Sequence, residues 1–183
     1  MQSPSFRPGR ASRLALVALL TLTTSCAAFG GDRETWRCNA SNGHYQDFSI
    51  PIGDKITTIT GRLNVHRADL SNEWPSVARI GFTDTSNPDS DCQCNGILLS
   101  THPGDKGVGF YMLVNGEPTL LSGRQFETAI TFKIVIDPNN QMTVAVGKSH
   151  VDSQTTGLPH PARDSVAMSC SGMDVSFLNI DPQ

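Results

Sequence analysis

Basic and aromatic side chains stand at alternating positions of several predicted strands. Arg62, Asn64 and His66 alternate with mostly apolar residues, so they share one face of a strand. Arg79 and Tyr111 likewise point away from the apolar rows of their own strands. A histidine or tyrosine base beside an arginine that neutralises a uronic carboxylate is the arrangement that a polysaccharide lyase needs. The same residues also suit a face that binds a ligand without reacting, or simply the hydrated face of a sheet.

Carboxylates suited to glycoside hydrolysis are scarce. Hydrolysis needs two carboxylates placed across the glycosidic bond, but each glutamate that follows the N-terminal segment is isolated in the sequence. Most aspartates stand in turn-like segments, where their usual role is to stabilise the turn. We therefore predict no catalytic residue among the glutamates, which are Glu34, Glu73, Glu117 and Glu127.

An oxygen-rich segment follows one predicted strand and runs from Asp84 to Asp91. Calcium prefers carboxylate and carbonyl oxygens, so Asp84, Asp89 and Asp91 are candidate calcium ligands. The segment lacks the glycine and the terminal glutamate of an EF-hand. An acidic turn without metal is therefore the alternative, and the sequence indicates no other cofactor.

Aromatic side chains that could stack on a sugar ring are few. Sugar C–H faces pack on aromatic rings, while sugar hydroxyls need hydrogen-bond partners. We expect Trp74, which precedes Pro75 at the start of a strand, to pack in the core, and the alternative places it on the rim of a groove. The sequence contains neither a Gly-x-Ser-x-Gly nucleophile motif nor a phosphate-binding glycine loop. The tryptophans and tyrosines are Trp36, Trp74, Tyr45 and Tyr111.

Strands are the elements that must position these residues. Short runs of period two, separated by turn residues, dominate from Lys55 to Asp181, and no long helical periodicity is present. The predicted inward rows are Ile59, Gly61, Leu63 and Val65, then Ala78, Ile80 and Phe82, then Val108, Phe110, Met112 and Val114.

A hairpin is predicted from Ile130 to Val146, with its turn at residues 137–141. A last pair of strands covers residues 166–170 and 175–180, and residues 149–164 are predicted to form a long loop. Eight or more strands at this spacing predict an all-β, two-sheet antiparallel β-sandwich. We expect residues 26–54 to supply its first strands and residues 55–183 to supply the rest of the same domain.

Several strand sequences resemble those of concanavalin A-like (laminin G-like) jelly-roll domains. They are Ile-Thr-Gly-Arg-Leu at 59–63, Pro-Ser-Val-Ala-Arg-Ile-Gly-Phe at 75–82, Phe-Lys-Ile-Val-Ile-Asp at 132–137, Thr-Val-Ala-Val-Gly at 143–147 and Val-Ser-Phe-Leu-Asn-Ile-Asp at 175–181. The superfamily includes lectins, carbohydrate-binding domains, glycoside hydrolases and polysaccharide lyases. The resemblance therefore implies the jelly-roll fold, and a glycan as the expected partner. The Glu-x-Asp-x-Glu strand of family-sixteen glucanases is absent.

The N-terminus has the order of charge, apolar core and small residues that is typical of a secretory signal peptide. Arg7, Arg10 and Arg13 precede an apolar run at 14–22, which is about half the ~20 residues that a transmembrane helix needs. Leu22 to Cys26 also resembles the lipobox of bacterial lipoproteins, although Thr23 stands where leucine is usual. Two alternatives remain: lipidation of Cys26 after removal of residues 1–25, or ordinary cleavage near Ala28. With lipidation, Ala27 implies outer-membrane retention.

Four further cysteines, an even number in an exported chain, favour two disulfides. Zinc is the competing idea, but Cys92-Gln93-Cys94 lacks the Cys-x-x-Cys spacing and has no histidine nearby. We expect Cys38 to pair with Cys170, because the end strands of a β-sandwich are often neighbours. Cys92 and Cys94 would then pair in a tight loop or stay free.

Net charge excludes one class of partner. Removing residues 1–25, with three arginines and no acid, changes the formal charge from -3 to -6, so nucleic acid is not expected. The first hypothesis is an exported, lipid-anchored or soluble, glycan-binding domain of the outer membrane, periplasm or extracellular space. The second is a small lyase or hydrolase that uses Arg62, His66, Arg79 and Tyr111. The third is an envelope protein that docks another protein through an apolar patch.

Overall fold

The computed structural model describes residues 33–53, 55–70, 74–83, 94–101, 107–125, 129–147, 152–157 and 164–183. Within these ranges every regular element is a strand, and no helix is long and apolar enough to cross a membrane. The strands are β1 (Glu34–Asn39), β2 (Gln46–Pro51), β3 (Thr58–Ala68), β4 (Ser76–Thr83), β5 (Asn95–Thr101), β6 (Gly107–Val114), β7 (Glu117–Gln125), β8 (Ile130–Ile136), β9 (Gln141–Val146), β10 (Asp152–Gly157), β11 (Ser165–Ser171) and β12 (Met173–Pro182).

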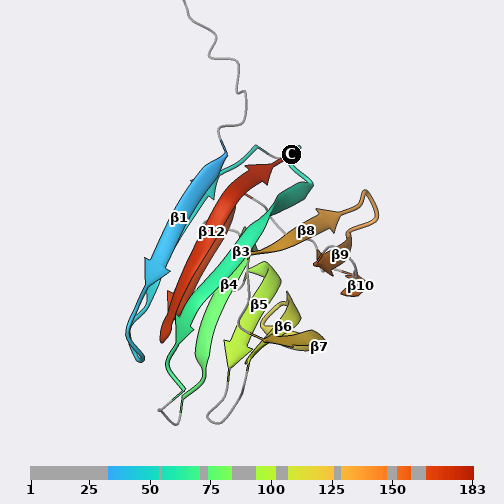
Figure 1. The fold of residues 1–183 in the computed structure, drawn as a ribbon. Coiled ribbons are helices and arrows are strands. Elements are labelled where there is room, and N and C mark those ends of the chain that lie inside the picture. The colour runs from blue at the N-terminus through green and yellow to red at the C-terminus, as the bar shows by residue number, and fades with distance from the viewer. Residues whose placement is uncertain are drawn as a thin grey trace, which may run out of the picture.

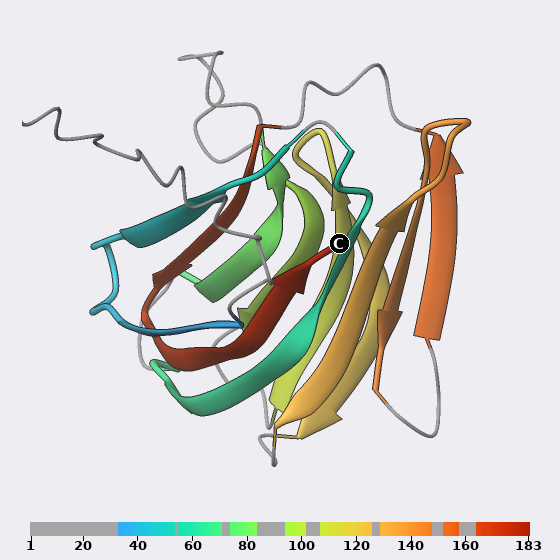
Figure 2. The ribbon, with the colours of Figure 1, turned by 90° about the horizontal axis from the view of Figure 1, so that it is seen from above.

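Two six-stranded antiparallel sheets pack face to face. Sheet A has the order β1-β12-β3-β8-β9-β10, and sheet B has the order β2-β11-β4-β5-β6-β7. Figure 1 shows the strands side by side, and Figure 2 shows the two layers from above. Half of the neighbouring strand pairs are consecutive in sequence, and the other half join strands far apart in the chain, as expected when a chain winds between two sheets. The predicted all-β, two-sheet antiparallel β-sandwich is confirmed.

Alternation along the strands builds the core between the sheets. Ile59, Ile80 and Phe110 are buried, and their outward neighbours are more exposed or have small side chains. Val65 and Val114 were also predicted to point into the core, but both are only partly buried and pack at its margin.

The β8–β9 hairpin is confirmed, and its turn is stabilised by one carboxylate. The backbone N–H groups of Asn139 and Gln141 each donate to Asp137 Oδ1 at 2.8 Å. Asn140 adopts a φ of 58°, a left-handed conformation that asparagine tolerates better than most residues.

The segment predicted as a long loop contains a strand, so that prediction was wrong in part. β10 pairs with β9 in continuous register, from Asp152 opposite Val146 to Gly157 opposite Gln141. Its sequence, Asp-Ser-Gln-Thr-Thr-Gly, has no apolar row. An edge strand is held by backbone hydrogen bonds along one side, which leave no periodic signal in the sequence.

The last two strands do not form the expected pair. β11 lies in sheet B and β12 lies in sheet A, although only Gly172 separates them. Gly172 has a φ of +67°, which glycine adopts readily. A Cβ at this position would lie 2.7 Å from Ser76 Oγ. The chain therefore crosses between the layers in one sharp turn.

The predicted disulfide between Cys38 and Cys170 is confirmed. Cys38 lies on β1 in sheet A and Cys170 on β11 in sheet B, with 6.1 Å between their Cα atoms. Both cysteines are fully buried. The bridge therefore links the two sheets through the core. Cys94 is buried directly before β5, and Cys92 lies outside the described residues.

Candidate functional site

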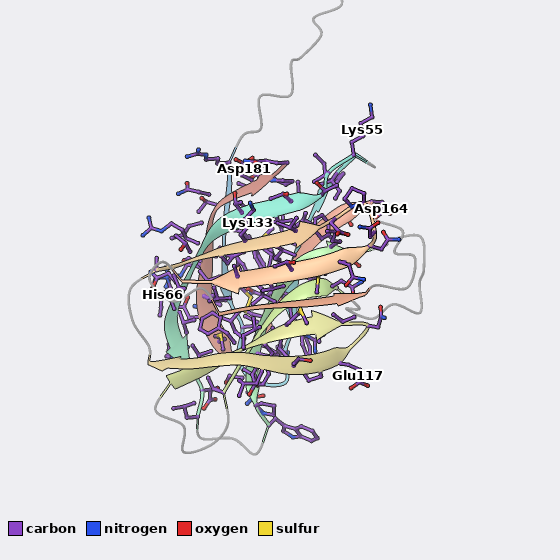
Figure 3. All side chains as sticks on the ribbon, turned by 90° about the vertical axis from the view of Figure 1, so that its right-hand side faces the viewer. Lys55, His66, Glu117, Lys133, Asp164 and Asp181 are labelled. Carbon is purple, nitrogen blue, oxygen red and sulfur yellow. A yellow bond between two sulfur atoms is a disulfide. The ribbon has the colours of Figure 1, made fainter. Side chains whose placement is uncertain are left out.

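The four residues predicted to bind a ligand are divided between the two sheets. Arg62 and His66 lie on β3 in sheet A, whereas Arg79 lies on β4 and Tyr111 on β6 in sheet B. Each points away from the core, so the two pairs lie on opposite outer surfaces of the sandwich. Figure 3 labels His66 on the β3 side. The single cluster that the enzymatic hypothesis requires is therefore not formed.

Arg79 and Tyr111 share one cross-strand row on the outer face of sheet B. Leu98 on β5 pairs with Arg79 on one side and with Tyr111 on the other. Ser169 on β11 extends the row beyond Arg79. With a strand spacing of about 4.8 Å, the backbones of Arg79 and Tyr111 are roughly 10 Å apart. That separation is comparable with the length of a short oligosaccharide.

The side chain of Tyr111 runs back along its own strand toward Gly109. A Cβ built on Gly109 would lie 2.7 Å from Cε2 of Tyr111 and 2.9 Å from its hydroxyl oxygen. The ring therefore occupies the space above Gly109, and Tyr111 itself is only partly buried. Ser100 on β5 is the register partner of Gly109, which places a hydroxyl next to the ring.

Small residues occupy much of the outer face of sheet B. Gly81 and Gly96 face each other between β4 and β5, and a Cβ on either would meet backbone atoms of the other strand. Four serines also lie on this face and are buried although they point away from the core. These serines are Ser100, Ser165, Ser169 and Ser171. The face thus combines an aromatic ring, a guanidinium and several hydroxyls, the groups that contact sugars.

The outer face of sheet A is dominated by an ion pair. Arg37 donates through Nε to Asp174 Oδ1 at 2.9 Å and through Nη2 to Oδ2 at 2.8 Å. These hydrogen bonds, with the charge of Arg37, lower the pKa of Asp174 and raise the pKa of Arg37. His66 Nε2 lies 2.8 Å from Ser176 Oγ, so the described hydrogen-bond partner of His66 is a serine on the neighbouring strand β12.

Trp74 corrects a further prediction, because it is not a core residue. Its exposed fraction is 75%, the largest among the exposed large hydrophobic residues. Trp36 does pack at the core margin, stacked on Phe48 and Phe177 with ring centroids 5.8 and 5.4 Å away. Trp36 lies within β1, whereas Trp74 lies two residues before β4 begins.

No candidate metal site is present in the part of the chain that the structure describes. No group of three or more His, Cys, Asp or Glu side chains there could hold a metal ion. Asp84, Asp89 and Asp91 lie outside the described residues, so calcium remains a prediction. Figure 3 shows Glu117, Asp164 and Asp181 at separate places on the molecule.

The sequence-based prediction missed the small residues beside Tyr111. Gly109 and Ser100 carry no motif, and their importance depends on the pairing of β5 with β6. The alternation along each strand does place Gly109 and Ser100 at outward positions. It could not show that they are neighbours, because it does not say which strands pair.

No protein-family model and no curated protein matches this sequence. Several solved structures share the fold at low identity. A sialidase has a TM-score of 0.54 and 9% identity over 81% of this chain, which covers 15% of the sialidase. The carbohydrate-binding module CBM66 from Bacillus subtilis has a TM-score of 0.48 and 9% identity, over 80% of this chain and 85% of the module. A scytalido-glutamic peptidase has a TM-score of 0.48 and 14% identity, over 76% and 74% of the two chains. At these identities the similarity concerns the β-sandwich fold alone.

Proposed function

We propose that this protein is an exported glycan-binding domain whose ligand lies on the outer face of sheet B. The observation that carries the proposal is the Tyr111 ring, which lies next to Gly109 and Ser100 on the outer face of sheet B and is only partly buried. A pyranose C–H face would stack on this surface.

Hydrogen-bonding groups around the ring would fix the orientation of the sugar. Arg79 lies in the same row two strands away, and Ser169 follows it. A ligand that stacks on Tyr111 and extends across β5 would reach these groups. The long axis of the bound glycan would therefore run across the strands of sheet B.

Binding without turnover is the form of this activity that the residues favour. The enzymatic hypothesis combined all four residues in one site, but Arg62 and His66 lie on sheet A, whereas the other two lie on sheet B. The carboxylate of the row that contains Tyr111 is Asp47 on β2, which lies four strands away, beyond Ser169. The domain would therefore recognise a glycan and release it unchanged.

Export is part of the proposal and is supported by the disulfide. Bridges such as Cys38–Cys170 form and persist in oxidising compartments. The N-terminal charge and apolar pattern points the same way. Lipidation at Cys26 would anchor the domain to a membrane, and ordinary cleavage near Ala28 would leave it soluble.

Calorimetric titration of the exported, disulfide-bonded protein with a panel of oligosaccharides tests the proposal. Wild-type protein should bind at least one glycan and release no product from it. Tyr111→Ala should weaken binding about tenfold or more, and Tyr111→Phe should retain most of it, since stacking supplies the larger part. Arg62→Gln, on the opposite surface, is the control and should leave the affinity unchanged.

Absence of binding across the panel would overturn the proposal, as would full affinity in Tyr111→Ala. Product release would show an enzyme instead. Repeating the titration with a chelator tests the calcium prediction separately. A loss of affinity that added calcium restores would support Asp84, Asp89 and Asp91 as ligands.

A further inference from the structure

Three connections meet at the end of the sandwich drawn at the bottom of Figure 1. They join β1 to β2, β3 to β4, and β11 to β12. Backbone hydrogen bonds hold them together: Asp69 N–H donates to Gly172 O at 2.8 Å, and Gly172 N–H donates to Ser41 O at 3.3 Å. The corner is therefore built by contacts between distant segments and not by any one loop.

A hollow of about 650 Å³ lies in this corner. That volume falls within the range of small-molecule sites, roughly 300–1,000 Å³. Its lining includes Ser41, Arg67, Asp69, Leu70 and Gly172. None of these residues belongs to the outer face of sheet B, so the hollow is distinct from the site proposed above.

Trp74 is fixed at the edge of this corner. Its backbone carbonyl accepts a hydrogen bond from Asn42 Nδ2 at 3.2 Å, and Asn42 follows Ser41 of the hollow. Two residues later, Ser76 Oγ donates to the carbonyl oxygen of Asp69 at 2.7 Å. Pro75 restricts the backbone between these anchors. The backbone is thus held on both sides while the indole remains 75% exposed.

Arg67 supplies a cation to the hollow. Its cross-strand partner Asp174 already has both carboxylate oxygens occupied by Arg37. Among the described residues Arg67 itself forms no ion pair. Arg67 lines the hollow, and the backbone of Trp74 is held at the same corner, so the corner offers charge, hydrogen-bond donors and an exposed aromatic ring.

We infer that this hollow is a second binding site, specific for an acidic sugar, a pyranose that carries a carboxylate. The C–H face of the pyranose stacks on Trp74, and its carboxylate pairs with the Arg67 guanidinium, which suits bidentate binding. Asp69 also lines the hollow, so the sugar presents hydroxyls and not its carboxylate to that side. The inference goes beyond the proposed function, because it adds a site and assigns the charge of its ligand.

The test is titration of the exported protein with oligomers of galacturonate, glucuronate and mannuronate, each beside its carboxyl-reduced, neutral form. Wild-type protein should bind at least one acidic oligomer more tightly than its neutral form. Arg67→Gln should lower that affinity about tenfold or more and remove the preference for the acidic form. Trp74→Ala should weaken binding of both forms, and quenching of indole fluorescence should disappear with it.

Two controls separate this site from nonspecific charge and from the site on sheet B. Arg62→Gln removes the same charge from the same strand, away from the hollow, and should leave binding unchanged. Tyr111→Ala should also leave acidic-oligomer binding unchanged, even if it abolishes binding of another glycan. Equal losses in Arg67→Gln and Arg62→Gln would overturn the inference, as would full affinity in Trp74→Ala or no preference for any acidic oligomer in the wild type.

Discussion

Gly109 shows how a residue without functional groups can shape a binding surface. The missing side chain lets the Tyr111 ring lie against the strand, within 2.7 Å of where a Cβ would stand. Gly81 and Gly96 differ from it, because a Cβ there would meet backbone and not a movable ring. Glycine therefore makes room for the Tyr111 ring at one position and for close strand pairing at the other two.

Gly109→Ala should weaken glycan binding by displacing the ring while leaving every polar group in place. We expect an affinity loss close to that of Tyr111→Ala, with a destabilisation of about 1 kcal/mol from the strained contact. Titration and chemical denaturation measure the two effects. Unchanged affinity in Gly109→Ala would mean that the position of the ring next to Gly109 is not needed for binding.

Asp174 should make stability depend on pH in a defined direction. Its pKa is lowered in the folded protein by hydrogen bonding to Arg37, so its stabilising effect is full above the unfolded value of about 3.9. That effect is lost as the pH falls through the lower, folded pKa. The difference in unfolding free energy between wild type and Asp174→Asn should thus be largest near neutral pH and shrink below about pH 4.

Urea denaturation of both proteins across this pH range measures the difference. Lys133→Gln, a change of an exposed charge on β8, serves as the control and should show no such trend. A constant difference between wild type and Asp174→Asn at all pH values would contradict the assigned role of the Arg37–Asp174 pair.

At the scale of elements, the bridge between β1 and β11 compensates for a weakly paired edge. β1 pairs only with β12 in sheet A, and β2 pairs only with β11 in sheet B. Both edge strands are short, and β2 is largely exposed. The Cys38–Cys170 bridge ties this side of the two sheets together through the core.

Replacing both cysteines by alanine should destabilise the domain by about 3–5 kcal/mol. The reason is that the bridge closes a sequence separation of 132 residues and so restricts the unfolded chain strongly. Guanidinium denaturation of the variant, and of wild type with and without reductant, measures the loss. A difference below about 1 kcal/mol would show that the sheets hold together without the bridge.

At the scale of the whole molecule, the proposed glycan site on sheet B and the hollow at the end of the sandwich occupy different surfaces. Tyr111 and Arg79 lie across the middle strands of sheet B, whereas Arg67 and Trp74 lie at one end of the sandwich. Two sites on one rigid domain would allow it to bridge two parts of a polymer. Export would place both sites where extracellular or envelope glycans occur.

Processing provides a prediction at this scale. Expressed in a bacterium, the chain should lose its N-terminal segment up to residue 25 or to the region of Ala28. Mass spectrometry of the envelope and soluble fractions should show the cut, and a lipid on Cys26 decides between the two alternatives. With lipidation, Cys26→Ser should release the domain from the membrane fraction. Recovery of an intact N-terminus from the envelope would contradict the proposed export.

Much of the strand pattern could be predicted from the sequence because it is a local property. Period-two alternation placed Ile59, Ile80 and Phe110 in the core, and all are buried. The turn at Asp137 was equally predictable, since its side chain bonds to backbone two and four residues away. The pairing of Cys38 with Cys170 followed from an even count and from the position of each near a chain end.

Only the tertiary structure decided which outward faces lie together. Alternation assigns a residue to one side of its strand, but it does not say to which sheet the strand belongs. Arg62 and Arg79 therefore looked equivalent, although they lie on opposite surfaces. The strand β10 forms only because its backbone pairs with β9. The backbone of Trp74 is likewise held by Asn42 from the β1–β2 connection. Such contacts join residues far apart in the chain, so no pattern within a single segment can record them.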